Sequence, residues 1–207
     1  MSASSSKLES FIKSGNFGSE LRKKLSGSEC TWPDPSPGIA LSSVLVPIEN
    51  IHTTKPQLIL TRRSTSLRTH AGEVAFPGGK REASESPREV ALREANEEVG
   101  LGQDSVEIIG CLKPVTPRVS KTLVVPVLGE VKGRPQLLPN REVDRVFRVD
   151  LADFITLKGY TARFYTDAAG EPVLIHYFNI LGELIWGATA RIIVEMLQVV
   201  DNTFLAR

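Results

Sequence analysis

Three glutamates in the segment 93–98, R-E-A-N-E-E, carry the clearest chemical signal in this sequence. On an α-helix, residues three and four positions apart share a face, so Glu94, Glu97 and Glu98 are expected to point their carboxylates into one small volume. Like charges at this spacing destabilise a helix by roughly a few tenths of a kcal/mol per pair unless a cation lies between them. Carboxylate oxygens suit Mg²⁺ and Mn²⁺. The spacing therefore predicts a divalent-metal site.

The helix that carries these glutamates has recognisable ends. Ser86 can serve as the N-cap, Pro87 fits the first helical position, and Glu89 stands where a capping-box acid reaches back to the cap. Gly100 can adopt the left-handed conformation that ends a helix. We therefore expect a helix from about residue 87 to residue 99, and its buried stripe should consist of Ala91, Leu92, Ala95 and Val99.

Arg93 and the residues before the helix complete the pattern. Arg93 lies four residues before Glu97, and Glu85 lies in the loop that enters the helix. A guanidinium group can hold carboxylates at orientations that their own repulsion would not permit. Gly78 and Gly79 lack a Cβ, so their backbone can approach a metal or a phosphate closely.

The stretch from residue 79 to residue 101 resembles the Nudix box, G-x5-E-x7-R-E-U-x-E-E-x-G-U, where U is a bulky apolar residue. The matching positions are Gly79, Glu85, Arg93, Glu94, Glu97, Glu98, Gly100 and Leu101. The departure is Ala95, where a larger aliphatic residue is usual. So many matches at fixed spacing are a specific signal. The resemblance implies a Nudix hydrolase, which cleaves a diphosphate with Mg²⁺ or Mn²⁺, and an α/β fold, the Nudix α/β/α sandwich with a mixed β-sheet.

A second pattern, directly upstream in residues 59–79, narrows the substrate. It is similar to the coenzyme A subgroup signature L-L-T-x-R-S-x3-R-x3-G-x3-F-P-G-G, with Ile59 in place of the first leucine. The spacing of the later segments 139–143 and 185–187 is most similar to the mitochondrial-type coenzyme A diphosphatases. The resemblance implies hydrolysis of coenzyme A or acyl-coenzyme A to 3′-phosphoadenosine 5′-phosphate and 4′-phosphopantetheine or its acyl derivative. The signature matches at Leu60, Thr61, Arg63, Ser64, Arg68, Gly72, Phe76, Pro77, Gly78 and Gly79.

The basic cluster in this signature suits a substrate with several phosphates. Arginine grips phosphate oxygens in a two-pronged geometry, and coenzyme A carries a diphosphate and a separate 3′-phosphate. A short basic cluster usually faces solvent, and the subgroup match is the reason to assign it a function. The substrate contacts expected are Arg62, Arg63, Ser64, Arg68, Gly78 and Gly79, with Arg118 and Lys121 as alternatives for the 3′-phosphate.

The resemblance implies metal-assisted hydrolysis, in which the metal and a carboxylate base activate a water while arginines neutralise charge on the phosphates. The expected metal ligands are Glu94, Glu97, Glu98 and the backbone carbonyl of Gly78. Arg93 and Glu97 are also expected to contribute to catalysis. The base is either Glu142, in the segment 139–143, or Glu94.

Two other functions remain open at this point. The first is a Nudix diphosphatase for another nucleoside diphosphate derivative, of the NADH or ADP-ribose type, because the helix sets the reaction and not the leaving group. The second is a non-catalytic nucleotide-binding module. The intact glutamates count against the second, since a binding module has no need for three repelling carboxylates.

Composition is that of an ordinary globular enzyme. The chain has 207 residues, of which 41% are hydrophobic and 24% charged, and its formal net charge of +1 provides no general field for nucleic acid or a membrane. We expect a helical extension with a Pro-rich linker over residues 1–37 and one Nudix domain over 38–207, as a monomer or homodimer.

Cys30 and Cys111 are expected to form neither a disulfide framework nor a zinc motif, with Cys111 packed in a strand. The small number of cysteines is consistent with a reducing compartment, so we expect an intracellular location, cytoplasmic or mitochondrial, without a clear targeting signal.

The remaining elements are expected from periodicity and turn residues. Residues 6–26 have helical spacing, and residues 139–148 suggest a loop and a short helix. A last amphipathic helix is expected at 186–200. Trp186, Phe178 and Tyr177 are expected in the core rather than in an adenine-stacking site, His176 as an ordinary strand residue, and His70 as a loop histidine without a fixed partner. Strands are expected at 39–48, 58–61, 106–112, 123–131, 160–165 and 173–180.

Overall fold

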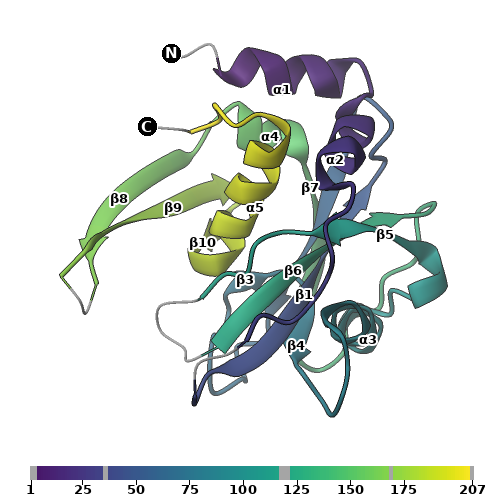
Figure 1. Cartoon of the computed structure of the whole chain (residues 1–207), viewed down its shortest axis with the longest axis vertical. Coiled ribbons are helices and arrows are strands. Elements are labelled where there is room, and N and C mark those ends of the chain that lie inside the picture. Colours follow the sequence, from purple (N-terminus) through teal and green to yellow (C-terminus); the bar gives the residue numbers. More distant parts are fainter. Residues whose placement is uncertain (1–3, 35–36, 117–121, 168–169, 206–207) are drawn as a thin grey trace.

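The computed structural model describes residues 4–34, 37–116, 122–167 and 170–205. Within them, a seven-stranded sheet forms the centre of the molecule, with the order β3-β2-β1-β6-β5, while β4 pairs with β1 and β7 pairs with β2 (Figure 1). The strands are β1 (Ala40–Glu49), β2 (Gln57–Arg63), β3 (Val74–Ala75), β4 (Gly78–Lys80), β5 (Val106–Cys111), β6 (Thr122–Val131) and β7 (Val143–Asp150).

The sheet is mixed, as predicted. Strands β1 and β6 run parallel along their whole length, from the pair Ala40 and Thr122 to the pair Glu49 and Val131. The other pairings of the named strands are antiparallel. Because β1 also pairs with β2 and β4, it lies at the centre of the sheet, next to Gly78 and Gly79 of β4.

Helices cover both faces of this sheet, which confirms the predicted α/β sandwich (Figure 1). Helix α3 (Pro87–Val99) buries Ala91, Ala95 and Val99 against Leu45 and its neighbours. Adjacent strand residues point to opposite faces, so Val46 joins a second buried cluster on the other side. The helices of that second cluster are α1 (Ser4–Lys13), α2 (Phe17–Leu25), α4 (Leu151–Ile155) and α5 (Gly187–Val200).

A second, three-stranded antiparallel sheet lies on the far side of α5 from the central sheet (Figure 1). It consists of β8 (Tyr160–Thr166), β9 (Pro172–Ile180) and β10 (Glu183–Trp186), in the order β10-β9-β8. Phe178, Ile180 and Ile185 are buried and join the cluster around α5. Helix α5 is therefore apolar over much of its circumference because it packs between two sheets.

One expectation about secondary structure was wrong, and another is refined. Residues 139–148 were expected to form a loop and a short helix, but most of them belong to β7, in which Val143, Phe147 and Val149 are buried. The helical stretch 6–26 is divided into two helices at Gly15, whose φ of 71° ends the first one. Strands β3, β4 and β10 have two to four residues each and give little periodic signal.

The prediction for the cysteines was also wrong in part. Cys111 lies in β5 as expected, but a disulfide joins it to Cys30. The two residues are 81 positions apart, so no local spacing marks them as partners. Among the described helices, none combines the length and the apolar character needed to cross a membrane.

Candidate active site

Helix α3, which carries the glutamate motif, has the ends that its sequence predicts. The Ser86 hydroxyl oxygen accepts a hydrogen bond from the Glu89 backbone N–H at 3.3 Å, and the Glu89 carboxylate accepts one from the Ser86 N–H at 2.7 Å. Gly100 takes a φ of 69°, and its N–H donates to the Asn96 carbonyl. The helix is thus fixed at both ends by its own residues, which sets the direction of its glutamates.

Arg93 organises the acidic residues around it. Its guanidinium makes two hydrogen bonds to the Glu85 carboxylate, at 2.8 and 3.1 Å, and one of them leaves from Nη2, which also donates to the Lys80 carbonyl. Its Nη1 lies 2.9 Å from Glu94 Oε1 and 3.3 Å from Glu97 Oε2. The hydrogen bond from Arg93 is the main reason that the pKa of Glu85 is lowered. The predicted arginine-carboxylate network is present.

Glu98 is the most deeply buried of the helix glutamates, with a side chain only 6% exposed. Its Oε2 accepts a hydrogen bond from the Gly78 N–H at 3.1 Å, and Arg63 Nη1 lies 3.6 Å from its Oε1. Burial raises the pKa of Glu98 to about 7, against the opposing effects of Gly78 and Arg63 and with added repulsion from Glu94 and Glu142. The charges of Glu94 and Glu142 therefore both act on the Glu98 carboxylate.

Glu94 lies beside Gly79. Burial is the main cause that raises the pKa of Glu94, Arg93 opposes it, and the charges of Glu97 and Glu142 add to the rise. A Cβ on Gly79 would overlap the Glu94 carboxylate, so only glycine leaves room for this arrangement. The loop candidate Glu142 is exposed, and its charge acts on Glu94 as well as on Glu98.

Glu97 departs from the expectation that three carboxylates converge. Its side chain is 54% exposed and is held by Arg93. Glu97 and Glu98 are consecutive, so their side chains leave the helix about 100° apart. In the described part of the chain, no group of three or more histidine, cysteine, aspartate or glutamate side chains is arranged to hold a metal ion.

The donors that do meet here nevertheless fit a hard divalent cation. They are oxygens, the ligand atoms that Mg²⁺ and Mn²⁺ prefer, and the charge of Glu94 helps to raise the pKa of Glu98. A cation between them would remove that repulsion.

The predicted phosphate-binding arginines lie on different sides of β2. Arg63 faces Glu98, whereas Arg62, the preceding residue, points to the opposite face and lies 3.5 Å from Glu183, which also binds Arg145 at 3.0 Å. Side chains alternate along a strand, so the two arginines cannot share one site. Arg68 is exposed in the loop that follows.

Ser64 organises that loop. Its side chain is buried and lies 3.0 Å from the Ser66 hydroxyl, and its N–H donates to the Glu142 carbonyl at 2.7 Å. This second bond ties the loop to the segment that carries the candidate base. His70 has a partner after all, because its Nδ1 lies 2.9 Å from Glu73 Oε2. Arg118 and Lys121 lie outside the described residues.

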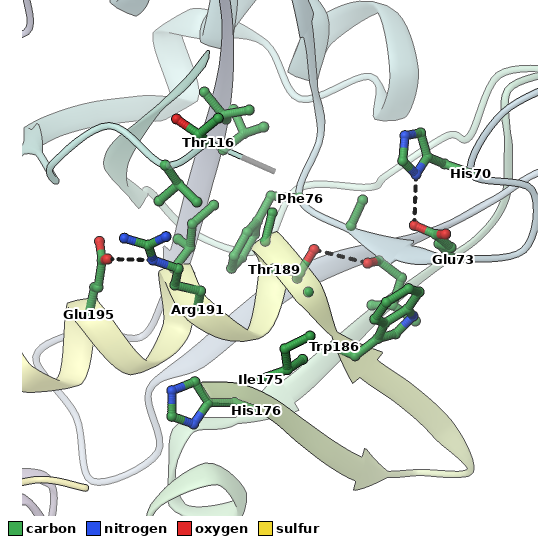
Figure 2. A pocket seen from close by; sticks show the side chains of 18 of the residues that line it. His70, Glu73, Phe76, Thr116, Ile175, His176, Trp186, Thr189, Arg191 and Glu195 are labelled. Atoms are coloured by element: carbon green, nitrogen blue, oxygen red, sulfur yellow. Dashed lines mark hydrogen bonds and ion pairs between the residues drawn. The ribbon is translucent and has the colours of Figure 1, made fainter. Parts of the chain in front are cut away.

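A cavity of about 1080 Å³ lies beside this site, although Glu94, Glu97, Glu98 and Glu142 are not among its lining residues (Figure 2). Arg63, Gly78 and Gly79 line one part of it, while Arg62, Ser64 and Arg68 are not among its lining residues. Figure 2 shows α5 crossing the cavity with Thr189 and Arg191, and Ile175 and His176 on the adjacent hairpin. The apolar part of the wall comes from both sheets and α5, and includes Val44, Phe76, Val115, Leu174, Ile175 and Ile192.

Sequence reasoning did not identify this wall. The Thr189 hydroxyl donates a hydrogen bond to the Val74 carbonyl at 3.0 Å, although the two residues are 115 positions apart. A local sequence pattern cannot predict such a contact. Of the three aromatic residues expected in the core, Phe178 is fully buried, but Trp186 is 36% exposed, lines the cavity and stacks with Tyr177. The available sequence signal was a tryptophan directly before the last amphipathic helix.

Comparison with known proteins adds the following. Residues 41–168 match the sequence model described as NUDIX domain. A protein of Photorhabdus laumondii named "Uncharacterized Nudix hydrolase NudL" is 39% identical over 164 residues, which span 77% of this chain and 84% of that protein. The protein of the same name from Yersinia enterocolitica is 35% identical over 190 residues, 89% of this chain and 95% of that protein. Among solved structures, a MutT/nudix family protein from Enterococcus faecalis has a TM-score of 0.49 and 17% identity, covering 95% of this chain and 74% of that one.

Proposed function

The chain belongs to the Nudix hydrolase family, and we propose that it hydrolyses the diphosphate of coenzyme A or acyl-coenzyme A in the presence of Mg²⁺ or Mn²⁺. Water would attack one phosphorus, and the bond from the bridging oxygen to that phosphorus would break. The products would be 3′-phosphoadenosine 5′-phosphate and 4′-phosphopantetheine, or its acyl derivative.

The observation that carries this proposal is that the cavity adjoins the glutamate site, because Arg63 and Gly78 line the cavity and also contact Glu98. Arg63, Gly78 and Gly79 belong to the coenzyme A signature, and they line the same cavity as the apolar residues of α5 and β9. A long substrate with phosphates near one end and an apolar arm at the other suits a wall that changes from charged to apolar. A volume of about 1080 Å³ lies just above the range of about 300 to 1,000 Å³ typical of small-molecule sites.

The roles of the residues follow from their placement. Glu94, Glu98 and the carbonyl of Gly78 would hold the divalent cation, with Glu97 further out, and the bound cation would polarise the phosphate and lower the pKa of water. Arg93 positions Glu94 and Glu97 through its hydrogen bonds. Arg63, which faces Glu98, would neutralise charge on the diphosphate.

We assign the general base to Glu142 rather than to Glu94. Glu94 already accepts a hydrogen bond from Arg93 and is confined by Gly79, so it has little freedom to take a proton from water. Glu142 is an exposed carboxylate whose charge acts on both buried ones. Its backbone carbonyl accepts a hydrogen bond from the Ser64 N–H, and its backbone N–H donates one to the Asn140 side chain. These two bonds fix the position of the backbone from which the carboxylate extends.

A direct assay tests this function. The purified chain with Mg²⁺ would be given coenzyme A, acetyl- and longer acyl-coenzyme A, NADH and ADP-ribose separately, and the products would be identified by mass spectrometry. We expect the two named products from the coenzyme A series, with the highest kcat/KM there. A higher kcat/KM on NADH or ADP-ribose would replace this substrate class by another nucleoside diphosphate derivative. Binding without turnover at any metal concentration would favour a non-catalytic module.

A further inference from the structure

The segment of residues 28–34, here called the strap, crosses from one face of the central sheet to the other. Before it, α2 packs in the cluster around α5, with Leu21 and Leu25 buried there. Within it, Cys30 and Trp32 pack against the cluster beneath the catalytic helix. The strap therefore passes around the β5 edge of the sheet and ends next to the loop that enters α3.

Two contacts fix the strap to β5. The disulfide joins Cys30 to Cys111, and the Cys111 N–H donates to the Ser28 hydroxyl at 3.4 Å. Gly110 makes this crossing possible, because a Cβ there would lie 2.6 Å from the Ser28 hydroxyl and 3.0 Å from the Leu25 Cβ. The strap therefore packs against β5 at Gly110, where the absence of a side chain leaves room for it.

Trp32 connects the strap to the entry loop of the catalytic helix. Its indole Nε1 donates a hydrogen bond to the Glu85 carbonyl at 2.6 Å. The same carbonyl accepts a second bond from Arg81 Nε at 3.1 Å, and the Arg81 guanidinium lies 5.4 Å from the centre of the Trp32 ring. Trp32 and Arg81 together fix the backbone of Glu85.

The side chain of Glu85 then fixes Arg93, and Arg93 fixes the glutamates. Glu85 accepts two hydrogen bonds from Arg93, whose third nitrogen reaches Glu94 and Glu97. A continuous set of contacts therefore runs from the disulfide through Trp32 and Glu85 to the carboxylates of the site. We propose that Trp32 is a positioning residue for Arg93, acting through Glu85, and that the Cys30–Cys111 disulfide keeps Trp32 in place.

The disulfide makes this device sensitive to a dithiol reductant. A dithiol attacks one sulfur, passes through a mixed disulfide, and leaves as a cyclic disulfide, so two electrons and two protons move to Cys30 and Cys111. Reduction removes the covalent tie and leaves the strap held by the Ser28 contact and by Trp32 itself. The amides of the entry loop should then open more often, including the Glu82 N–H that donates to the Glu85 carboxylate.

The first experiment compares the parent with Trp32→Phe, which keeps an aromatic ring under Arg81 and removes the N–H donor together with the pyrrole part of the indole. The kcat on the best substrate should fall about three- to tenfold, the loss expected for one hydrogen bond to the carbonyl, while KM changes by less than about twofold. In the Glu85→Gln background, Trp32→Phe should cost much less, because the path from Trp32 to Arg93 is already weakened. An unchanged kcat, or an equal loss in both backgrounds, overturns the positioning role even if the Tm falls.

The second experiment tests the disulfide with a readout that needs no substrate. Hydrogen exchange over residues 80–86 should accelerate in Trp32→Phe, in the parent after dithiothreitol, and in the double variant Cys30→Ser/Cys111→Ser. That double variant should be insensitive to dithiothreitol, which makes it the matched control. The role of the disulfide would be refuted if mass spectrometry showed that dithiothreitol had reduced Cys30 and Cys111 in the parent, but neither hydrogen exchange nor kcat had changed. Since the inference rests on the proposed function only for its kinetic readout, a wrong substrate class would leave the exchange results intact.

Discussion

The catalytic helix with its entry loop, residues 81–99, and the cavity wall formed by α5 and β9 differ in the sequence distance between contacting residues. In the first region, Glu85 and Arg93 are eight residues apart, and the capping pair Ser86 and Glu89 are three apart. In the second, the Thr189 hydroxyl bonds the Val74 carbonyl across 115 residues. The contacts that hold α3 and Arg93 are mostly local, although Trp32 and Arg63 reach this region from distant segments, whereas the contacts of the cavity wall depend on the whole topology.

This difference predicts two kinds of mutational effect. Changes in the local network should reduce turnover on every substrate, because they act on the reacting group that all substrates share. Changes in the cavity wall should alter KM, and only for substrates long enough to reach it. Each of the following substitutions tests one side of that division.

The largest effect is expected from Glu98→Gln, which removes the charge of the most buried carboxylate and keeps its volume. We expect kcat to fall by about a hundredfold or more on all substrates at saturating Mg²⁺, with the fold intact by circular dichroism. Glu107→Gln, a change of the same chemistry at an exposed position of β5, serves as the control. Near-normal turnover with an unchanged metal requirement would remove Glu98 from the site.

The second effect concerns the space around Glu94. In Gly79→Ala the new methyl group would overlap the Glu94 carboxylate, which must then move from its place beside Arg93. We expect kcat to fall about ten- to a hundredfold for every substrate, because a small displacement of a catalytic group has a large effect. Gly102→Ala has no atom near the added carbon and should behave as the parent. Equal kinetics for the two variants would show that Glu94 tolerates displacement.

The third effect separates the arginines of the signature. Arg63 faces Glu98, so Arg63→Ala should lower kcat/KM by about ten- to a hundredfold on coenzyme A and on dephospho-coenzyme A alike. Arg68, exposed in the loop, is the candidate for the 3′-phosphate, and Arg68→Ala should affect coenzyme A alone. Arg62→Ala is the matched control, because Arg62 binds Glu183 on the other face of β2. If both Arg63→Ala and Arg68→Ala discriminate between the two substrates, the division of roles is incorrect.

These residues also show how far the sequence could predict the molecule. The limits of α3, its caps and the bonds of Arg93 were predictable, because every contributing residue lies within about two helical turns. The greater exposure of Glu97 was not predicted, because the shared face was inferred without the rotation of about 100° between Glu97 and Glu98. The pairing of Cys30 with Cys111 was not predicted, because it depends on the path of the strap across β5. The spacing of the two cysteines in the sequence does not reveal that path.

The smallest effect is expected in the cavity wall, and it tests the division most directly. Leu174 on β9 lines the cavity, whereas Leu184 on the neighbouring strand β10 is 52% exposed and lies outside it. Leu174→Ala should raise KM about three- to tenfold for an acyl-coenzyme A whose chain contacts it, in line with the loss of a partly buried apolar surface. The KM for dephospho- and unacylated coenzyme A should change less, and kcat should stay near the parent value for all of them. Leu184→Ala, which deletes the same atoms from the outer surface, should leave every kinetic constant unchanged.

Both variants remove the same side-chain atoms, Leu174→Ala from the cavity wall and Leu184→Ala from the outer surface. An equal effect on KM would therefore mean that the cavity does not receive the substrate. A fall in kcat for Leu174→Ala on short and long substrates alike would mean that the wall and the catalytic helix act as one unit, against the separation inferred from their contacts.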